Sequence, residues 1–185
     1  MSDDARIFVR PEEPDDLVRV FELTEAAFGR PIEAKLNDEL RREVSPLISL
    51  VATRGSESGP IVGHSMWSPV EVRGGAHSSG GTTSWAFALG PISVWPDDQR
   101  RGIGGELIRA GLDACRELGE LVVFLLGHPA YYPRFGWREA HDRGLWYNGR
   151  PGPNPAFMVI ELAHAALAGR KGEVVYSESF QRIEG

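Results

Sequence analysis

A short glycine-rich segment, Gln-Arg-Arg-Gly-Ile-Gly-Gly at residues 99–105, has the composition of an anion-binding loop. Its three glycines let the backbone approach a ligand without a side chain in the way, and Arg100 and Arg101 add positive charge. From Ile103 onward apolar residues recur at helical spacing, so the segment opens a helix whose first N–H groups have no intrahelical partner. This pattern predicts a diphosphate site at a helix N-terminus. The alternative is a tight strand-to-helix turn whose glycines serve packing only.

Two other phosphate-binding loops can be tested by spacing. The sequence contains no Gly-x4-Gly-Lys-[Ser/Thr], the loop of nucleotide triphosphatases. The dinucleotide-binding fingerprint requires a third glycine or an alanine where this chain has Leu107. Neither alternative fits the segment.

Residues 99–104 resemble the [Gln/Arg]-x-x-Gly-x-[Gly/Ala] motif of the GNAT N-acetyltransferase superfamily, which holds the diphosphate of acetyl-CoA. A second stretch, Gly-His-Pro-Ala-Tyr-Tyr-Pro-Arg-Phe-Gly-Trp at residues 127–137, resembles the Tyr-x-x-x-Gly-Phe ending of that family. Its Gly-x-Pro-x-Tyr-Tyr-x-Arg-Phe-Gly form is similar to a subgroup of predicted bacterial acetyltransferases. The chain departs from many members at Leu125, where they carry Asn.

Hydrophobic periodicity and the positions of Gly and Pro predict the elements that surround these motifs. The predicted helices cover residues 14–28, 31–44, 103–118 and 130–135, with a helical turn at 163–168. The predicted strands cover residues 6–10, 47–53, 61–72, 84–95, 121–126, a stretch from 137, 156–162 and a last edge strand at 173–176. Residues 74–83 are rich in Gly, Ser and Thr and predict a mobile hairpin tip.

These elements add up to an α+β fold, and the resemblance implies the GNAT form of it. We expect a central, mixed, mostly antiparallel sheet with helices on both faces. At 185 residues the chain is expected to be a single N-acetyltransferase domain over residues 1–185, with a core at about 6–162 and a C-terminal extension at 163–185.

The resemblance also implies where acetyl-CoA binds. Gly90-Pro91 interrupts the fourth strand, which predicts a bulge or a break, and in the family the bulged strand diverges from the fifth to open a V-shaped slot. The pantetheine arm is expected to pair with the main chain of Ile92, Ser93 and Val94. The diphosphate is expected on Gln99, Arg100, Arg101, Gly102, Ile103, Gly104 and Gly105.

Acetyl transfer to an amine needs a neutral amine, a polarised thioester carbonyl and a stabilised leaving thiolate. The family motif makes Tyr132 the candidate catalytic residue, a hydrogen-bond or proton donor to the thiolate, with packing as the alternative. On reference values a tyrosine is about 1.5 pK units weaker an acid than a thiol. Tyr131 is interpreted as a packing residue.

The general base stays open among His64, His128, Glu71, Glu25 and a water chain to a carboxylate. His64 lies between apolar residues of a strand, which favours a core histidine. No group of His, Cys or carboxylate residues has metal-ligand spacing, so no metal site is expected.

The resemblance therefore implies an acyltransferase that uses acetyl-CoA as co-substrate and moves the acetyl group directly to an amine. The acceptor could be a small amine, an antibiotic, an amino acid or a protein, and the chain a monomer or a homodimer. The alternatives are a non-catalytic acyl-CoA-binding sensor module and a transferase of a longer acyl chain.

The amino-acid composition argues against nucleic acids and membranes as binding partners. The net charge of −6 argues against nucleic-acid binding, which depends on many Lys and Arg contacts. The N-terminus lacks a secretory pattern, and the longest apolar run, residues 121–126, is far shorter than a membrane span. A cytoplasmic location is expected. Cys115, the single cysteine, falls among apolar helix positions and is expected to be buried and inert.

Overall fold

The computed structural model describes residues 6–74 and 83–184. Within these residues nine strands form one sheet in the order β1-β2-β3-β4-β5-β8-β6, and β9 pairs with both β3 and β7. All pairings are antiparallel except β4 with β5 and β7 with β9. The strands are β1 (Ile7–Pro11), β2 (Ile48–Arg54), β3 (Ile61–Arg73), β4 (Thr83–Val94), β5 (Val122–Leu126), β6 (Arg138–Glu139), β7 (Leu145–Tyr147), β8 (Phe157–Glu161) and β9 (Gly172–Val175).

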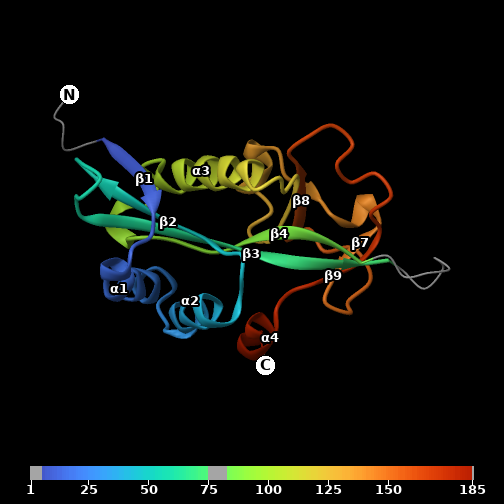
Figure 1. The fold of residues 1–185 in the computed structure, drawn as a ribbon, viewed down its shortest axis with the longest axis horizontal. Coiled ribbons are helices and arrows are strands. Elements are labelled where there is room, and N and C mark those ends of the chain that lie inside the picture. Colours follow the sequence, from blue (N-terminus) through green and yellow to red (C-terminus); the bar gives the residue numbers. More distant parts are fainter. Residues whose placement is uncertain (1–5, 75–82, 185) are drawn as a thin grey trace.

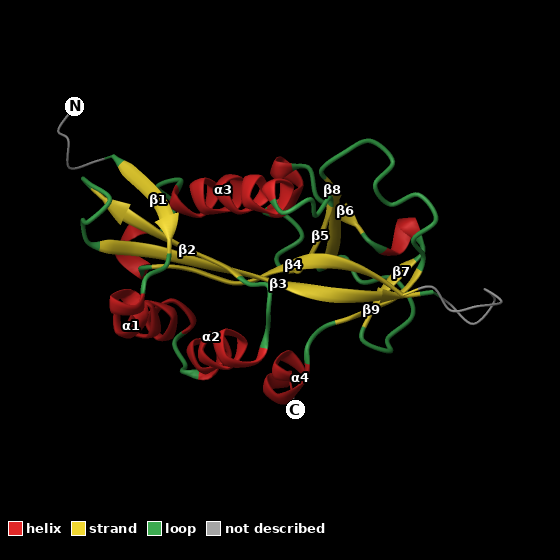
Figure 2. Ribbon diagram, in the orientation of Figure 1, coloured by secondary structure: helices red, strands yellow, loops and turns green. Residues whose placement is uncertain are grey.

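Helices cover both faces of this sheet (Figures 1 and 2). On one face lies α3 (Ile103–Glu117), and on the other lie α1 (Leu17–Phe28), α2 (Ile32–Glu43) and the C-terminal α4 (Glu178–Glu184). Short 3-10 turns connect the elements: η2 (Pro14–Asp16), η3 (Pro96–Asp98), η4 (Tyr132–Phe135) and η5 (His141–Arg143). The predicted mixed, mostly antiparallel α+β sheet with helices on both faces is confirmed.

The core under α3 contains several large aromatic side chains, among them Trp67, Phe87 and Trp137. Trp67 of β3 is fully buried and lies directly against the backbone of Gly111 in α3. Ile103, Leu107 and other apolar residues of α3 complete this core against β2, β3, β4 and β5. The helical spacing of these residues is what turns one face of α3 toward the sheet.

On the opposite face two smaller clusters fix the other helices. Val20 and Leu23 of α1 pack on the sheet, while Leu36 and Leu40 of α2 pack on Met66 of β3. Phe180 and Ile183 of α4 pack against the second of these clusters. Phe180 also packs against a cluster that contains Val70 and Ala86 of the sheet, so helix α4 is held both by α2 and by the sheet itself.

Most elements begin and end within two residues of the sequence prediction, but the C-terminal third differs. The sequence prediction did not include β7 and α4, and residues 163–168 form turns rather than a helical turn. The prediction of an edge strand at 173–176 was wrong in one respect, because β9 has a neighbour on each side and is no free edge. The hairpin tip predicted at 74–83 lies largely outside the described residues.

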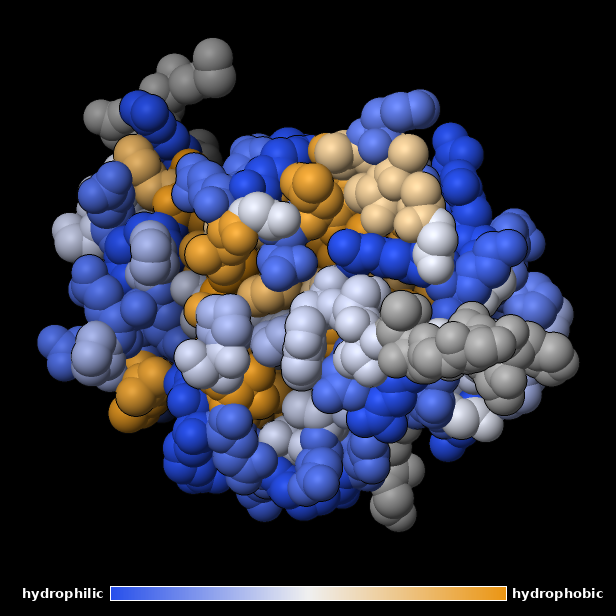
Figure 3. All heavy atoms as spheres, turned by 45° about the vertical axis from the view of Figure 1, so that its right-hand side comes forward, coloured by the Kyte–Doolittle hydropathy of each residue, from blue (hydrophilic) through white to orange (hydrophobic). Residues whose placement is uncertain are grey.

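The surface is mixed in character. On the face drawn in Figure 3, hydrophobic residues form separate patches among hydrophilic ones. Of the helices that the structure describes, none has the length and apolar character needed to cross a membrane.

Candidate active site

Strand β4 carries a bulge where its sequence reads Gly90-Pro91. Ser65 of β3 pairs with Ile92 and Trp67 pairs with Leu89, so two residues of β4 stand opposite a single residue of β3. The expected bulge is thus confirmed. A bulge bends its strand and leaves ladder groups without partners, which here happens at the centre of the sheet.

Strands β4 and β5 separate just before this bulge. Their parallel pairing covers only Phe87–Leu89 against Val123–Leu125, and among the described residues β4 has no partner on the β5 side beyond Leu89. The main chain of residues 92–94 is therefore paired with β3 on one side and open on the other. This divergence is the V-shaped slot that the resemblance implied.

The glycine-rich loop follows the open end of β4. Gly102 is the residue before the first turn of α3 and has φ of 89°, in the left-handed region that favours glycine. Its carbonyl accepts the N–H groups of Gly105 and Glu106, at 2.9 and 3.2 Å. The N–H groups that precede these at the helix N-terminus have no backbone acceptor in the described part of the chain, which suits them to an anion.

A cleft of about 690 Å³ runs along the open edge of β4 to this helix N-terminus. It brings together all the predicted cofactor-binding residues except one: Ile92, Ser93, Val94, Gln99, Arg100, Gly102, Ile103, Gly104 and Gly105. The exception is Arg101, whose guanidinium pairs with Asp98 at 3.4 Å and does not line the cleft. Gln99 donates its side-chain amide to the Val94 carbonyl at 3.2 Å and so ties the loop to the end of β4.

The second sequence motif forms the opposite wall of the same cleft. A Cβ built on Gly104 would lie 3.1 Å from the Tyr131 hydroxyl, and one on Gly105 would lie 3.5 Å from the Phe135 ring. Tyr131, Arg134, Phe135 and Arg109 also line the cleft, and these four were not predicted from the sequence as binding residues. Three of them belong to the Tyr-Tyr-x-Arg-Phe motif, but the motif does not tell which of its side chains face a ligand; Arg109 belongs to α3, and no sequence motif marked it.

Tyr132 lies behind this wall rather than on it. Its side chain belongs to the core under α3, the residue is 8 % exposed, and its ring meets that of Tyr131 edge to face at 5.1 Å. The ring also lies against Gly127, just beyond β5, where a Cβ would come within 2.4 Å of Cε2. Burial raises the pKa of the Tyr132 hydroxyl to about 12, so it is protonated at neutral pH and can donate a hydrogen bond.

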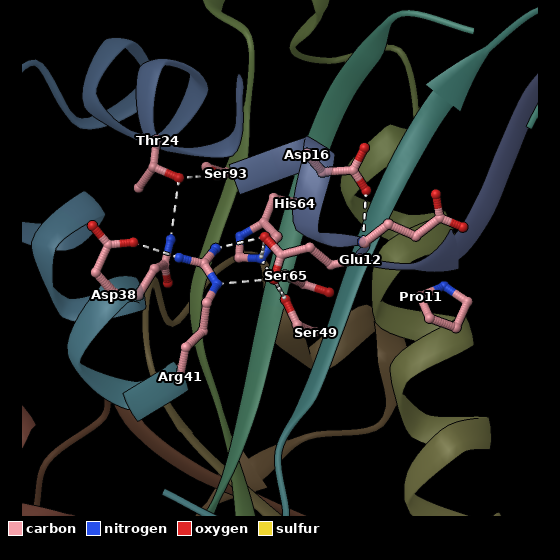
Figure 4. A network of polar contacts seen from close by, with 12 residues as sticks. Pro11, Glu12, Asp16, Thr24, Asp38, Arg41, Ser49, His64, Ser65 and Ser93 are labelled. Atoms are coloured by element: carbon pink, nitrogen blue, oxygen red, sulfur yellow. Dashed lines mark hydrogen bonds and ion pairs between the residues drawn. The ribbon is translucent and has the colours of Figure 1, made fainter. Parts of the chain in front are cut away.

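A buried polar network lies on the other face of β4, beneath α1 and α2 (Figure 4). The hydroxyl of Ser93 lies 3.1 Å from that of Thr24, which accepts a hydrogen bond from the amide of Asn37 at 3.3 Å. These two contacts join β4 to both helices, so the strand that borders the cleft is held from behind.

His64, the cross-strand neighbour of Ser93, belongs to the same network. Its Nε2 lies 2.9 Å from the Ser49 hydroxyl, which donates to a Glu12 carboxylate oxygen at 2.6 Å. Since the one hydroxyl proton goes to Glu12, Nε2 must be the donor to Ser49 and Nδ1 the unprotonated nitrogen. Nδ1 is buried and has no partner within the described residues. Burial, followed by the charge of Arg41, lowers the pKa of His64 to about 3, so this ring is neutral.

The other base candidates also lie away from the cleft. His128 is exposed and accepts the backbone N–H of Ala130 at 3.3 Å, which is a turn contact. Glu71 pairs with Arg73 at 2.6 Å, and Glu25 is exposed on α1. None of these side chains, nor His64, lines the cleft. Leu125, where many family members carry Asn, is buried in the core.

The slot in the sheet, the bulge beside it and the glycine loop at the start of α3 define the chain as a member of the GNAT acetyltransferase family. The acetyltransferase (GNAT) domain model matches residues 9–140. The chain is 35% identical over 180 residues to the uncharacterized N-acetyltransferase YhbS of Escherichia coli K12, covering 96% of this chain and all of that protein. It is also 35% identical over 143 residues to the uncharacterized N-acetyltransferase YjhQ of the same strain, covering 76% of this chain and 72% of that protein.

Two solved structures share the fold over nearly the whole chain. The structure of Escherichia coli YhbS in complex with CoA has a TM-score of 0.82 at 34% identity and covers 96% of this chain and 93% of that one. A GNAT family acetyltransferase from Brucella melitensis in complex with acetyl-CoA has a TM-score of 0.71 at 31% identity, covering 95% and 99%. The GNAT fold predicted from the sequence is thus confirmed.

Proposed function

We propose that this protein is an acetyl-CoA-dependent N-acetyltransferase that moves the acetyl group directly to an amine. One observation carries the proposal: the open edge of β4 leads, within a single cleft, into the N-terminus of α3. The open edge suits the amide groups of a pantetheine arm, and the helix N-terminus suits the diphosphate. The CoA and acetyl-CoA complexes of the two similar proteins support this assignment. The form of the 127–136 segment supports membership of the bacterial subgroup that shares it.

In this proposal, backbone N–H groups at the bulge polarise the thioester carbonyl. Direct transfer passes through a tetrahedral species whose oxygen carries negative charge, and backbone N–H groups stabilise such an oxyanion. Pro91 has no N–H group, so the donors come from its neighbours Gly90 and Ile92. The attacking amine gains rate because thioester and amine are held together in one site.

The role of Tyr132 in this proposal rests on its position in the family motif, because its side chain is not among those that line the cleft. In this role Tyr132 acts on the leaving group. Against a thiol pKa of about 8.5, a phenol pKa of about 12 makes complete proton transfer uphill by about 5 kcal/mol. Tyr132 therefore stabilises the thiolate by donating a hydrogen bond, and solvent completes the protonation. His64 does not act as the base, because the ring is fully buried and its pKa of about 3 is far below that of an amine.

Thermal unfolding with and without acetyl-CoA tests the cofactor assignment. At about 100 times Kd, a ligand that binds only the native state adds about 2.7 kcal/mol, which for a chain of this size raises the midpoint by about 5–11 °C. Gly102→Glu is expected to abolish the rise because it puts a negative side chain at the helix N-terminus. Gly119→Glu is the matched control: Gly119 also has positive φ and free space around it, but it lies at the far end of α3.

Three outcomes separate the candidate functions. A rise that Gly119→Glu keeps and Gly102→Glu loses supports acetyl-CoA binding, and thiol release in the presence of a panel of amines then identifies the acceptor class. If acetyl-CoA binds but no amine in the panel causes release of the CoA thiol, the protein is the acyl-CoA sensor. No rise at millimolar acetyl-CoA would overturn the proposal.

A further inference from the structure

The wall of the cleft carries two arginines that lie outside the glycine-rich loop. Arg109 and Arg134 line the cleft from α3 and η4, and both lie near the Phe135 ring. Both side chains are exposed, and neither belongs to the glycine-rich motif. The inference drawn from them rests on the proposed function, because it concerns another part of the same co-substrate.

Arg134 is held in place before any ligand arrives. Its Nε donates to the Tyr131 carbonyl at 2.8 Å, and its guanidinium carbon lies 4.4 Å from the centre of the Tyr131 ring. The terminal nitrogens of this guanidinium make no hydrogen bond within the part of the chain that the structure describes. Stacking on an aromatic face leaves the edge of a guanidinium free to form two parallel hydrogen bonds, the geometry that a phosphate monoester accepts.

Arg109 reaches the same place from the helix. Its Cα lies about 7.5 Å along α3 from Gly104, but helical side chains lean toward the N-terminus. Accordingly its Nη1 lies 3.6 Å from the position of a Cβ on Gly105, beside the Phe135 ring. Its other terminal nitrogen, Nη2, donates to Glu106 at 2.8 Å on the surface, an exposed pair that a phosphate can replace at little cost.

We propose that Arg109 and Arg134 form a clamp for the 3′-phosphate of CoA, so that this enzyme discriminates CoA from dephospho-CoA. The diphosphate at the N-terminus of α3 is joined directly to the ribose that carries this phosphate. The ribose therefore lies within one sugar's length of the helix start, where the two guanidiniums are placed. A phosphate monoester near pH 7 carries close to two negative charges, and two arginines match that charge.

The test compares CoA with dephospho-CoA by isothermal titration calorimetry on the full chain. The wild type is expected to bind CoA more tightly than dephospho-CoA by at least about tenfold. Arg134→Ala and Arg109→Ala are each expected to weaken CoA binding by about tenfold and to leave dephospho-CoA binding unchanged. Added KCl is expected to reduce the preference for CoA because exposed charges are screened.

Two further variants serve as references. Arg116→Ala removes an arginine of the same helix that pairs with Asp113 at 2.6 Å just as Arg109 pairs with Glu106, but it lies outside the cleft, and it should change neither affinity. Arg100→Ala removes a charge at the glycine loop and should weaken both ligands equally.

The outcomes keep this proposal separate from the assignment of the cofactor. Equal affinity of the wild type for the two ligands, or a preference that Arg109→Ala and Arg134→Ala leave intact, would overturn the clamp while the proposed function stands. Failure of both ligands to bind the wild type would overturn the proposed function and the clamp together.

Discussion

Tyr132 is a donor whose protonation state cannot change over the working pH range. Its pKa of about 12 results first from burial and then from the neighbouring Tyr131. In Tyr132→Phe the hydrogen bond to the thiolate is lost while the ring and its packing remain. We expect turnover to fall by about 10²-fold with CoA affinity unchanged. Because the group does not titrate, the pH profile of thiol release between pH 6 and 9 should keep its shape, and unchanged turnover would assign Tyr132 to packing.

His64 makes the stability of the fold depend on pH. Its pKa is about 3 in the folded protein against 6.5 for the free side chain, so below pH 6.5 the unfolded chain takes up a proton that the folded chain does not. The stability is therefore complete above pH 6.5 and is lost as the pH falls toward 3. On going from pH 7 to pH 5, this effect lowers the free energy of unfolding by about 2 kcal/mol.

The variant His64→Gln isolates the contribution of His64 to the pH dependence of stability. Gln stays neutral at every pH, and its amide can still donate a hydrogen bond to Ser49. In urea unfolding, the wild type should lose about 2 kcal/mol more than His64→Gln on going from pH 7 to pH 5. Parallel losses in the two proteins would mean that His64 is protonated in the folded state.

At the scale of elements, α3 contains two glycines that differ in their tolerance of a side chain, one against the sheet and one against η4. A Cβ on Gly111 would lie 2.0 Å from the Trp67 ring, which is fully buried and cannot move away. A Cβ on Gly105 would make only ordinary contact, at 3.5 Å from the Phe135 ring. In a helix the change from Gly to Ala otherwise gains up to about 1 kcal/mol.

The two substitutions should therefore change the free energy of unfolding in opposite directions. We expect Gly111→Ala to destabilise by about 1–3 kcal/mol or more through overpacking, and Gly105→Ala to be neutral or stabilising, both measured by urea unfolding without ligand. A stable Gly111→Ala variant would show that α3 and β3 can move apart.

The elements around the cleft were predictable because their signals are local. Gly90-Pro91 interrupts an apolar run and Gly102 precedes a helical period, so the bulge and the loop can be located without tertiary information. The divergence of β4 from β5 is different, since it followed from family resemblance and not from the residues themselves. The position of Tyr131 on the cleft wall, with Tyr132 behind it, depends on which side of η4 faces α3, and a turn of four residues has no period that reveals this.

The C-terminal part was the least predictable because its structure depends on distant partners. Strand β9 has only four residues and forms between β3 and β7, and α4 has seven residues, too few to be stable alone. Helix α4 exists because Phe180 and Ile183 pack against the α2 cluster and because Arg182 pairs with Glu39 and Glu43 at 2.9 and 2.6 Å. These contacts join positions about 140 residues apart in the chain.

At the scale of the whole molecule, the C-terminal helix α4 and the ligand cleft lie on opposite faces of the sheet. Helix α4 lies on the α1 and α2 side, whereas the cleft is bordered by α3 and η4 (Figure 1). Ending the chain after Ser177 removes α4 and uncovers the cluster of Leu36, Leu40 and Met66. We expect this truncation to lower the free energy of unfolding by about 2–4 kcal/mol. For this chain length, such a loss lowers the unfolding midpoint by about 4–16 °C.

The rise in midpoint caused by acetyl-CoA should survive this truncation, because no residue of α4 lines the cleft. Differential scanning fluorimetry of the full and shortened chains, each with and without acetyl-CoA, measures both quantities in one experiment. Phe180→Ala should give a smaller loss of the same kind. If the truncated chain unfolds at a lower temperature and also loses its response to acetyl-CoA, the two faces are coupled through β4. The contact that would couple them is the one between Phe180 and the bulge, where a Cβ on Gly90 would lie 3.8 Å from the Phe180 ring.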